Sequence, residues 1–205
     1  MPHAGQRRDN APMARIIAGT AGGRRIEVPK GDLTRPTSDR VREALFSGLD
    51  ARQVLRGAKV LDLFAGSGAL GLEAASRGAC EVVLVDSARG AAAVARRNAT
   101  VLGLSAVRVV LASVQRFLAG NPPFLAGSPA DVVFIDPPYA LGQGELGDIL
   151  EAVAARWLAP DGLIVVERSA RSPEPRWPDR LARSDVRRHG ETALWFAVLR
   201  PEESG

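Results

Sequence analysis

The chain has 205 residues, 46% of them hydrophobic, which is enough to bury a complete hydrophobic core and predicts one domain. Its single cysteine, Cys80, excludes an internal disulfide framework and favours a reducing cytoplasm, and its apolar neighbours predict that it is buried. No apolar run approaches the roughly 18 residues that cross a membrane, and the first residues contain no apolar signal segment. Disulfide-rich secreted proteins and membrane proteins are therefore excluded.

Positive charge is concentrated in the first quarter of the chain. The net charge is +4 and the sequence pI is about 10.1. Residues 1–56 hold 11 Lys/Arg and 6 Asp/Glu, so the remaining residues together carry a net charge of −1. Most of the basic residues are arginines, whose planar guanidinium suits phosphates and stacks on bases, so one interpretation is a nucleic-acid partner. The other is a solvated arginine-rich surface, and composition alone favours neither.

The N-terminal quarter is expected to extend the main domain. The expected organisation is a disordered tail at 1–13, a basic extension at 14–56 and a main domain at 57–200, the last two forming one compact unit. Two short strands at 15–18 and 24–28 flank a glycine-rich turn, which predicts a hairpin. Arg24 and Arg25 on this hairpin either contact nucleic-acid phosphates or face solvent.

A helix and then alternating strands and helices follow. The helix is expected over 38–49, with Val41, Leu45 and Leu49 on its apolar stripe and Arg40, Arg42 and Glu43 on its opposite face. Strands are expected at 60–64, 81–86, 107–111, 131–135 and 163–167, and helices after Gly68 and at 88–102, 114–119 and 145–157. Strands at 181–189 and 193–199 form a closing antiparallel hairpin. This order predicts an α/β fold with a doubly wound, mostly parallel sheet that binds ligands at the carboxyl ends of its strands.

A glycine-rich turn follows the first buried strand. Gly66, Gly68 and Gly71 match a GxGxxG pattern, and Asp86 lies 20 residues after Gly66, where it can accept ribose hydroxyls. This pattern alone suits NAD equally well. Asp62 lies within the strand, four residues before Gly66, and a carboxylate there can hold the cationic amino group that S-adenosylmethionine has and NAD lacks. The alternative for Asp62 is a carboxylate that caps a turn or helix.

A second polar motif, Asp136-Pro137-Pro138-Tyr139, ends the fourth expected strand. The Asp136 carboxylate and the Pro137 carbonyl can hold the N–H groups of an exocyclic amine, and Tyr139 can stack on a flipped base. Free aspartate has a pKa of about 3.9, so Asp136 is expected to position the amine and stabilise charge rather than abstract a proton. An ordinary turn after a strand is the alternative. No histidine has partners at metal-ligand spacing, so no metal site is expected.

Four segments together resemble the RsmD family, whose members methylate the N2 amine of a guanine in small-subunit ribosomal RNA with S-adenosylmethionine. They are RPTSDRVREALF at 35–46, DLFAGSGALGLEAASRGA at 62–79, VLVD at 83–86 and FIDPPY at 134–139. The resemblance implies a Rossmann-like class I methyltransferase fold. It also implies that the substrate is 16S ribosomal RNA within an assembled or assembling subunit. We expect a cytoplasmic monomer with no membrane partner.

The resemblance also implies roles for individual residues. Asp62, Ala65, Gly66, Ser67 and Gly68 would surround the methionine part of the cofactor, Asp86 would bind its ribose, and Asp136 to Tyr139 would hold the guanine, with Asp136 also beside the cofactor. Arg35, Thr37, Arg40 and Glu43 would close over the site. Many relatives have Asp or Asn after the third strand to hold the adenine amine. Ser113 stands near that point here and can accept the same hydrogen bond.

Three alternatives remain open from the sequence. The amine could belong to adenine N6 or to a protein glutamine, because an Asp/Asn-Pro-Pro-aromatic turn serves several amines. A nicotinamide-dependent oxidoreductase would use the same glycine turn, although no hydride-transfer acid is evident. A non-catalytic RNA-binding module would retain the fold without the reaction.

Overall fold

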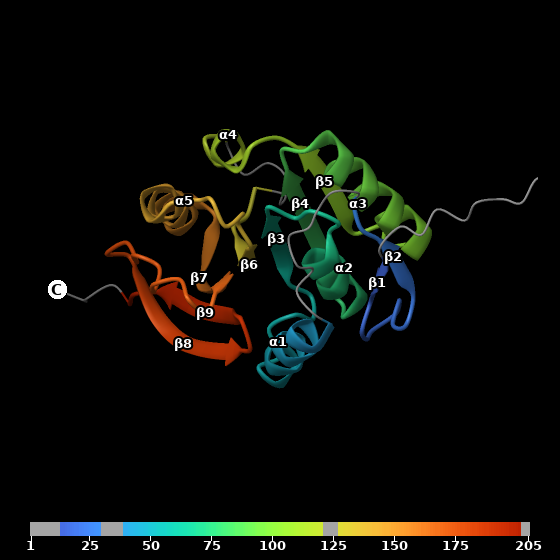
Figure 1. Ribbon diagram of the computed structural model, residues 1–205, viewed down its shortest axis with the longest axis horizontal. Coiled ribbons are helices and arrows are strands. Elements are labelled where there is room, and N and C mark those ends of the chain that lie inside the picture. The colour runs from blue at the N-terminus through green and yellow to red at the C-terminus, as the bar shows by residue number, and fades with distance from the viewer. Residues whose placement is uncertain (1–12, 30–38, 121–126, 202–205) are drawn as a thin grey trace, which may run out of the picture.

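A seven-stranded sheet with helices on both faces forms the body of the protein (Figure 1). This computed structural model describes residues 13–29, 39–120 and 127–201. The strands are β3 (Lys59–Leu63), β4 (Glu81–Asp86), β5 (Val107–Leu111), β6 (Ala130–Ile135), β7 (Leu158–Ser169), β8 (Leu181–His189) and β9 (Thr192–Leu199). Their order is β5-β4-β3-β6-β7-β9-β8. The pairs among β3 to β7 are parallel, and β9 runs antiparallel to both β7 and β8, which confirms the predicted doubly wound sheet with its closing hairpin.

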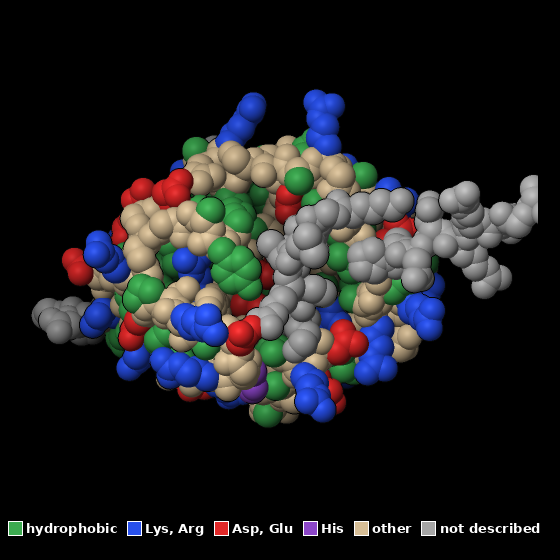
Figure 2. Space-filling model, in the orientation of Figure 1, with side chains coloured by type: hydrophobic (Ala, Val, Ile, Leu, Met, Phe, Trp, Pro, Cys, Tyr) green, Lys and Arg blue, Asp and Glu red, His purple; other side chains and the backbone are tan. Residues whose placement is uncertain are grey.

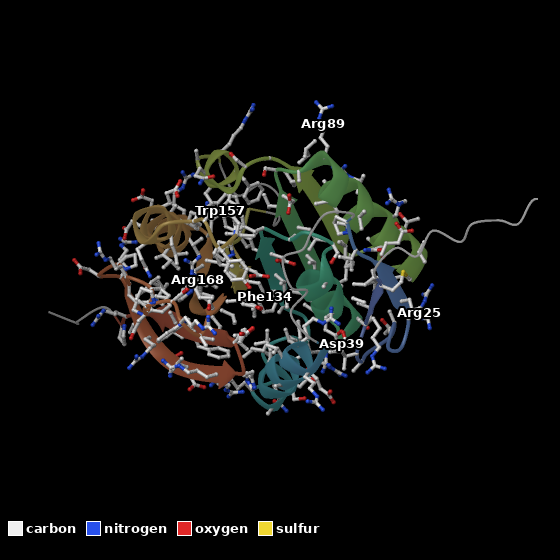
Figure 3. The ribbon with its side chains drawn as sticks, viewed as in Figure 1. Arg25, Asp39, Arg89, Phe134, Trp157 and Arg168 are labelled. Atoms are coloured by element: carbon white, nitrogen blue, oxygen red, sulfur yellow. The ribbon has the colours of Figure 1, made fainter. Side chains whose placement is uncertain are left out.

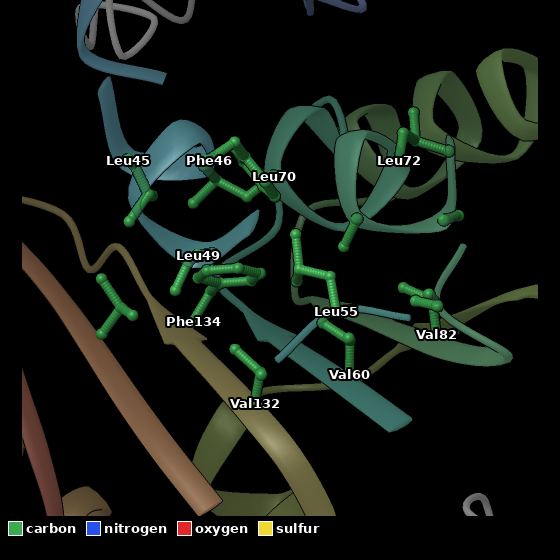
Figure 4. Packing of buried hydrophobic residues seen from close by; sticks show 14 of the residues in the cluster. Leu45, Phe46, Leu49, Leu55, Val60, Leu70, Leu72, Val82, Val132 and Phe134 are labelled. Atoms are coloured by element: carbon green, nitrogen blue, oxygen red, sulfur yellow. The ribbon is translucent and has the colours of Figure 1, made fainter. Parts of the chain in front are cut away.

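Two hydrophobic cores lie on opposite faces of the sheet. The helices are α1 (Asp39–Ala51), α2 (Ala69–Ser76) and α3 (Arg89–Leu102) on one face, and α4 (Val114–Leu118) and α5 (Gln143–Arg156) on the other (Figure 1). Successive side chains of a strand point to opposite faces, so Val60 packs into the first core and Leu61 into the second. In the first core, Phe46 of α1 contacts Phe134 of β6, with 5.7 Å between ring centroids (Figure 4). This contact fixes α1 over the carboxyl half of β6.

The N-terminal hairpin is shorter than the pattern predicts. Strands β1 (Met13–Arg15) and β2 (Arg25–Glu27) pair antiparallel, whereas strands were expected at 15–18 and 24–28. The buried carboxylate of Glu73 in α2 explains the difference. It accepts the N–H groups of Ile17 (2.7 Å) and Ala18 (3.1 Å), which a longer β1 would have donated to a strand partner. Met13, expected to end the tail, is the first residue of β1.

Replacing Glu73 with alanine is expected to lower the free energy of unfolding by about 3–5 kcal/mol, because three donors then lose a fully buried acceptor. The third donor is Nε of Arg77, 2.7 Å from the carboxylate. Urea denaturation measures the change, and the exposed Glu151→Ala in α5 is the matched control. Equal unfolding midpoints for the two variants would contradict this role for Glu73.

Three local expectations were wrong. Arg42 was expected on the face of α1 opposite the apolar stripe, yet it is 1% exposed, because the buried stripe also includes Phe46, one turn further along the helix. Cys80 is exposed rather than buried, since it lies in the connection before β4 and not in the core, with Sγ 2.9 Å from the Gly57 carbonyl oxygen. Strand β7 begins five residues before the expected start, at Leu158, where it pairs with Ala130.

None of the helices in residues 13–29, 39–120 and 127–201 combines the length and apolar character that a membrane span requires.

Candidate functional site

A cleft of about 290 Å³ opens at the carboxyl ends of β3 and β6. The strand order reverses between these two neighbours, which is the place where open α/β sheets bind ligands. Its lining includes Arg42, Asp62, Phe64, Ala65, Gly66, Ser67, Asp86, Asp136, Pro137, Pro138, Tyr139, Glu167, Arg168 and Thr192. The glycine turn and the Asp-Pro-Pro-Tyr turn, 70 residues apart in the chain, therefore share one opening.

Asp62 is buried at the base of this cleft. Its side chain is on β3, is 1% exposed, and its Oδ2 accepts the Gly71 N–H at 2.9 Å. Burial raises the pKa of Asp62 to about 7; the hydrogen bond from Gly71 opposes this rise, and the charge of Asp86 adds to it. The Asp62 carboxylate thus accepts a hydrogen bond from the first turn of α2, as expected if it caps this helix, and it also lines the cleft. A buried carboxylate with a raised pKa gains most from a cation placed against it, which fits an ammonium-bearing cofactor.

The glycine turn carries the chain from β3 into α2 with unusual backbone geometry. Gly68 precedes α2 in the left-handed region at φ 83°, where a side chain would be strained. A Cβ on Gly71 would lie 2.2 Å from a methyl group of Leu84 on the neighbouring strand, so any side chain there would have to push Leu84 aside. Phe64, which is not a glycine, also has a positive φ of 63°, and such backbone strain is typical of binding sites.

Asp86 ends β4 and holds the turn from the side. Its Oδ2 accepts the Gly66 N–H at 2.8 Å and its Oδ1 accepts the Ala88 N–H at 2.7 Å. Each carboxylate oxygen can accept a second hydrogen bond, so both remain able to bind ribose hydroxyls. The 20-residue spacing therefore has a geometric basis, because it aligns the ends of two neighbouring parallel strands.

The Asp-Pro-Pro-Tyr turn forms the other side of the cleft. The Asp136 N–H donates to the Leu63 carbonyl at 3.4 Å, and the Leu141 N–H donates to the Pro138 carbonyl at 2.9 Å. Tyr139 is 63% exposed, an unusual position for a large aromatic ring. In the face of the molecule that Figure 2 shows, hydrophobic side chains gather near the middle, while most arginines and lysines lie around the outline. An exposed ring at the opening is suited to stacking against a planar ligand.

Not every residue predicted for the site lines the cleft. Ser113 accepts the Arg116 N–H at 3.3 Å as the cap of α4, and it does not line the cleft. Arg40 and Glu43 are exposed on α1 and also do not line it. The positions of Arg35 and Thr37 lie outside the described residues.

The two hairpin arginines differ in their contacts. Arg24 donates to the carbonyl oxygens of Leu102 and Val101 at the end of α3, so it stabilises that helix end. Arg25 is exposed and extends from the periphery in Figure 3. Of these two arginines, Arg24 is therefore bound to the end of α3, and Arg25 is not.

Three charged residues of the cleft were not assigned to it from the sequence. Arg42 donates from Nη2 to the Arg15 carbonyl (2.6 Å) and to Asp39 Oδ1 (2.7 Å). Its burial lowers its pKa, while the charge of Asp39 opposes this. Glu167 and Arg168 follow the apolar part of β7, and Arg168, labelled in Figure 3, is half-buried and donates to the Leu141 carbonyl at 3.0 Å. The carboxyl ends of parallel strands meet at one edge of the sheet, and Glu167 ends the strand expected at 163–167. The same strand-end position that predicts Asp86 and Asp136 therefore also predicts Glu167 as a residue of the cleft.

No cluster of three or more His, Cys, Asp or Glu side chains suited to a metal ion occurs in the described part of the chain. The charged groups that line the cleft are instead of both signs: the acids are Asp62, Asp86, Asp136 and Glu167, and the bases are Arg42 and Arg168. Such a site favours an organic ligand that carries both cationic and donor groups.

Comparison with known proteins assigns the chain to a family. Residues 14–198 match the family model described as conserved hypothetical protein 95. The chain is 41% identical over 165 residues to ribosomal RNA small subunit methyltransferase D of Escherichia coli K12, covering 80% of this chain and 79% of that protein. A solved structure of a hypothetical protein from Thermus thermophilus superposes with a TM-score of 0.77 at 35% identity, over 91% of this chain and 99% of that one.

A more distant structure shares the fold alone. It is the magnesium protoporphyrin IX methyltransferase of Synechocystis PCC 6803, with a TM-score of 0.62 at 14% identity, over 78% of this chain and 79% of that one. The fold is thus the Rossmann-like fold of class I methyltransferases. With its motifs gathered at one cleft and its relatives matched over most of their length, the chain belongs to the RsmD family of small-subunit ribosomal RNA methyltransferases.

Proposed function

We propose that this protein transfers a methyl group from S-adenosylmethionine to the exocyclic N2 amine of a guanine in 16S ribosomal RNA. The observation that carries the proposal is that Asp62 and Asp136, on neighbouring parallel strands, open onto the same cleft. One carboxylate suits the cationic amino group of the cofactor, and the other suits the N–H groups of the target amine. Family membership supports the reaction class and the RNA substrate.

The residues of the chain position the reactants. S-adenosylmethionine supplies an electrophilic sulfonium methyl group. Asp62 would pair with the ammonium group, the backbone of Ala65 to Gly68 would surround the methionine part, and Asp86 would bind the ribose hydroxyls. These residues would hold the cofactor at the β3 side of the cleft, whose other side is formed by Asp136 and the residues after it.

The Asp-Pro-Pro-Tyr turn would act on the amine. Asp136 and the Pro137 carbonyl would accept its two N–H groups, and Tyr139 would stack on the base. Held in this way, the amine would present its lone pair to the sulfonium methyl carbon, and the electron pair of the broken carbon–sulfur bond would remain on sulfur. The methylated amine then loses one proton to solvent, because its positive charge makes it a strong acid. Asp136 stabilises the charge while it exists.

The substrate context is a further part of the proposal. We infer that the enzyme acts as a cytoplasmic monomer on an assembled or assembling small subunit, as the family resemblance implies. Folded RNA would reach the cleft from the side of Tyr139. The exposed hairpin residue Arg25 would then contact RNA phosphates.

Arg25→Gln is expected to weaken RNA binding and to lower the slope of log affinity against log salt concentration by about one. Filter binding at several salt concentrations measures this slope. Arg180→Gln, also exposed but beside the opposite edge strand β8, is the control. An unchanged slope for Arg25→Gln would make this arginine an ordinary solvated residue.

One experiment tests the function itself. Modified nucleosides in 16S ribosomal RNA are mapped by mass spectrometry in cells with and without this gene. We expect one N2-methylguanosine to disappear without the gene and to return when purified protein and S-adenosylmethionine are added to the isolated subunits. Identical maps from the two strains would refute the proposal, and loss of a methylated adenosine instead would support the adenine alternative.

A further inference from the structure

A second carboxylate lies beside Asp136 in the cleft. Strands β6 and β7 are parallel, and Ile135, the last residue of β6, pairs with Val166, so Asp136, which directly follows β6, and Glu167 of β7 come next in the register. Neighbouring strands are about 4.8 Å apart. Both residues line the cleft. The cleft therefore contains two adjacent acceptor groups rather than one.

The two carboxylates belong to the same face of the sheet. Phe134 and Val165 precede them by two residues, and both pack into the core beneath α1. Residues two apart on a strand share a face, so Asp136 and Glu167 face the side that α1 covers. Arg42 of α1 lines the cleft there, and Glu167 is one of the charges that act on it. Arg42 thus brings a positive charge to the side of the cleft where Glu167 lies.

Guanine offers a complementary pair of donors. Its Watson–Crick edge carries the N1–H beside the N2 amine, whereas adenine has an unprotonated acceptor nitrogen at N1 and no amine at C2. One carboxylate and a carbonyl can satisfy the amine, but they leave the N1–H without an acceptor. A buried donor without a partner costs about 1–3 kcal/mol. A second acceptor beside the first removes this cost for guanine and would repel the lone pair of an unprotonated N1.

We propose that Glu167 accepts the N1–H of the target guanine and so selects guanine over other bases. This inference rests on the proposed function, because it concerns the same amine in the same cleft. Asp136 holds the group that reacts, and Glu167 reads the neighbouring position that does not react. The division explains why a charged residue lies near the carboxyl end of β7, in a cleft where β3 and β4 are proposed to supply the cofactor contacts.

The test removes the N1–H from the RNA base and the carboxylate of Glu167 from the enzyme in separate experiments. Small subunits are reconstituted with ribosomal RNA that carries either guanosine or 2-aminopurine at the methylated position. 2-Aminopurine keeps the amine at C2 but has an acceptor at N1. The unaltered enzyme is expected to prefer guanosine by at least roughly 100-fold in kcat/KM. Glu167→Gln is expected to lose roughly 10- to 100-fold on guanosine and to discriminate little between the two bases, because its amide can donate to the unprotonated N1.

Controls separate recognition from folding. Glu167→Gln should keep the thermal midpoint and the S-adenosylhomocysteine affinity of the unaltered protein, and Glu167→Asp should keep the preference for guanosine at a reduced rate. Glu151→Gln, exposed on α5, should change neither base preference nor rate. Undiminished discrimination by Glu167→Gln would overturn the inference while leaving the proposed function intact. Failure of the unaltered enzyme to methylate the guanosine-containing subunit would overturn both.

Discussion

Asp136→Ala is expected to lower kcat for methyl transfer to small subunits by about 10²- to 10³-fold while leaving the affinity for S-adenosylhomocysteine within about twofold. The carboxylate is proposed to hold the amine and to offset the positive charge that develops on its nitrogen. Its loss therefore removes transition-state stabilisation rather than cofactor binding. Single-turnover assays with radiolabelled cofactor measure the rate, and calorimetry measures the affinity.

The matched control for this variant is Asp161→Ala. Asp161 is an exposed aspartate near the start of β7, away from the carboxyl ends of the strands, so its removal should leave the rate unchanged. Full activity of Asp136→Ala would remove the assignment of the Asp-Pro-Pro-Tyr turn as the amine site. Equal loss of rate and of cofactor affinity would instead give Asp136 a cofactor role alone.

The affinity for S-adenosylhomocysteine is expected to rise by roughly 20-fold between pH 5.5 and pH 7.5. The pKa of Asp62 is raised to about 7, so most Asp62 side chains are protonated at the lower pH. An ammonium group binds the carboxylate form of Asp62. Ligand binding must therefore release the Asp62 proton at low pH, whereas at high pH most Asp62 side chains have already lost it. Calorimetry in two buffers of different ionisation enthalpy measures both the affinity and the released proton.

Asp62→Asn tests whether Asp62 is the group that titrates. Asparagine keeps an oxygen for the Gly71 N–H but has no charge, so the affinity should become nearly independent of pH over this range and fall roughly 10- to 100-fold at pH 7.5. The pH dependence of the stability of the ligand-free protein gives an independent measurement. Because the folded pKa lies above the ordinary value of 3.8, Asp62 makes stability fall as pH rises from about 4 to 7. An unaltered pH dependence of binding in Asp62→Asn would exclude Asp62 as the ammonium partner.

The alternating pattern of strands and helices was predictable because each element buries a continuous apolar run. The predicted ranges 81–86, 107–111 and 181–189 agree with β4, β5 and β8. Asp62, Asp86 and Asp136 were predictable as partners because the carboxyl ends of parallel strands meet at one edge of the sheet. Family membership confirms the resemblance and decides against the nicotinamide alternative.

The remaining features depend on contacts between distant segments. The burial of Arg42 depends on how α1 is rotated over β6, which the contact of Phe46 with Phe134 determines. The short β1 depends on Glu73, more than 50 residues away, which takes the N–H groups of the following loop. Periodicity within one segment contains neither kind of information. The role of Ser113 as a helix cap likewise depends on the local path of the chain after β5.

The docking of the N-terminal loop against Glu73 has a consequence for biosynthesis. Ile17 leaves the ribosome early, but its acceptor is 56 residues further along the chain. At about 5–20 residues per second, translation needs roughly 3–11 seconds to supply that acceptor. We therefore expect the loop around Ile17 to stay undocked during this interval, so that a segment made early packs only after the α2 helix has been synthesised.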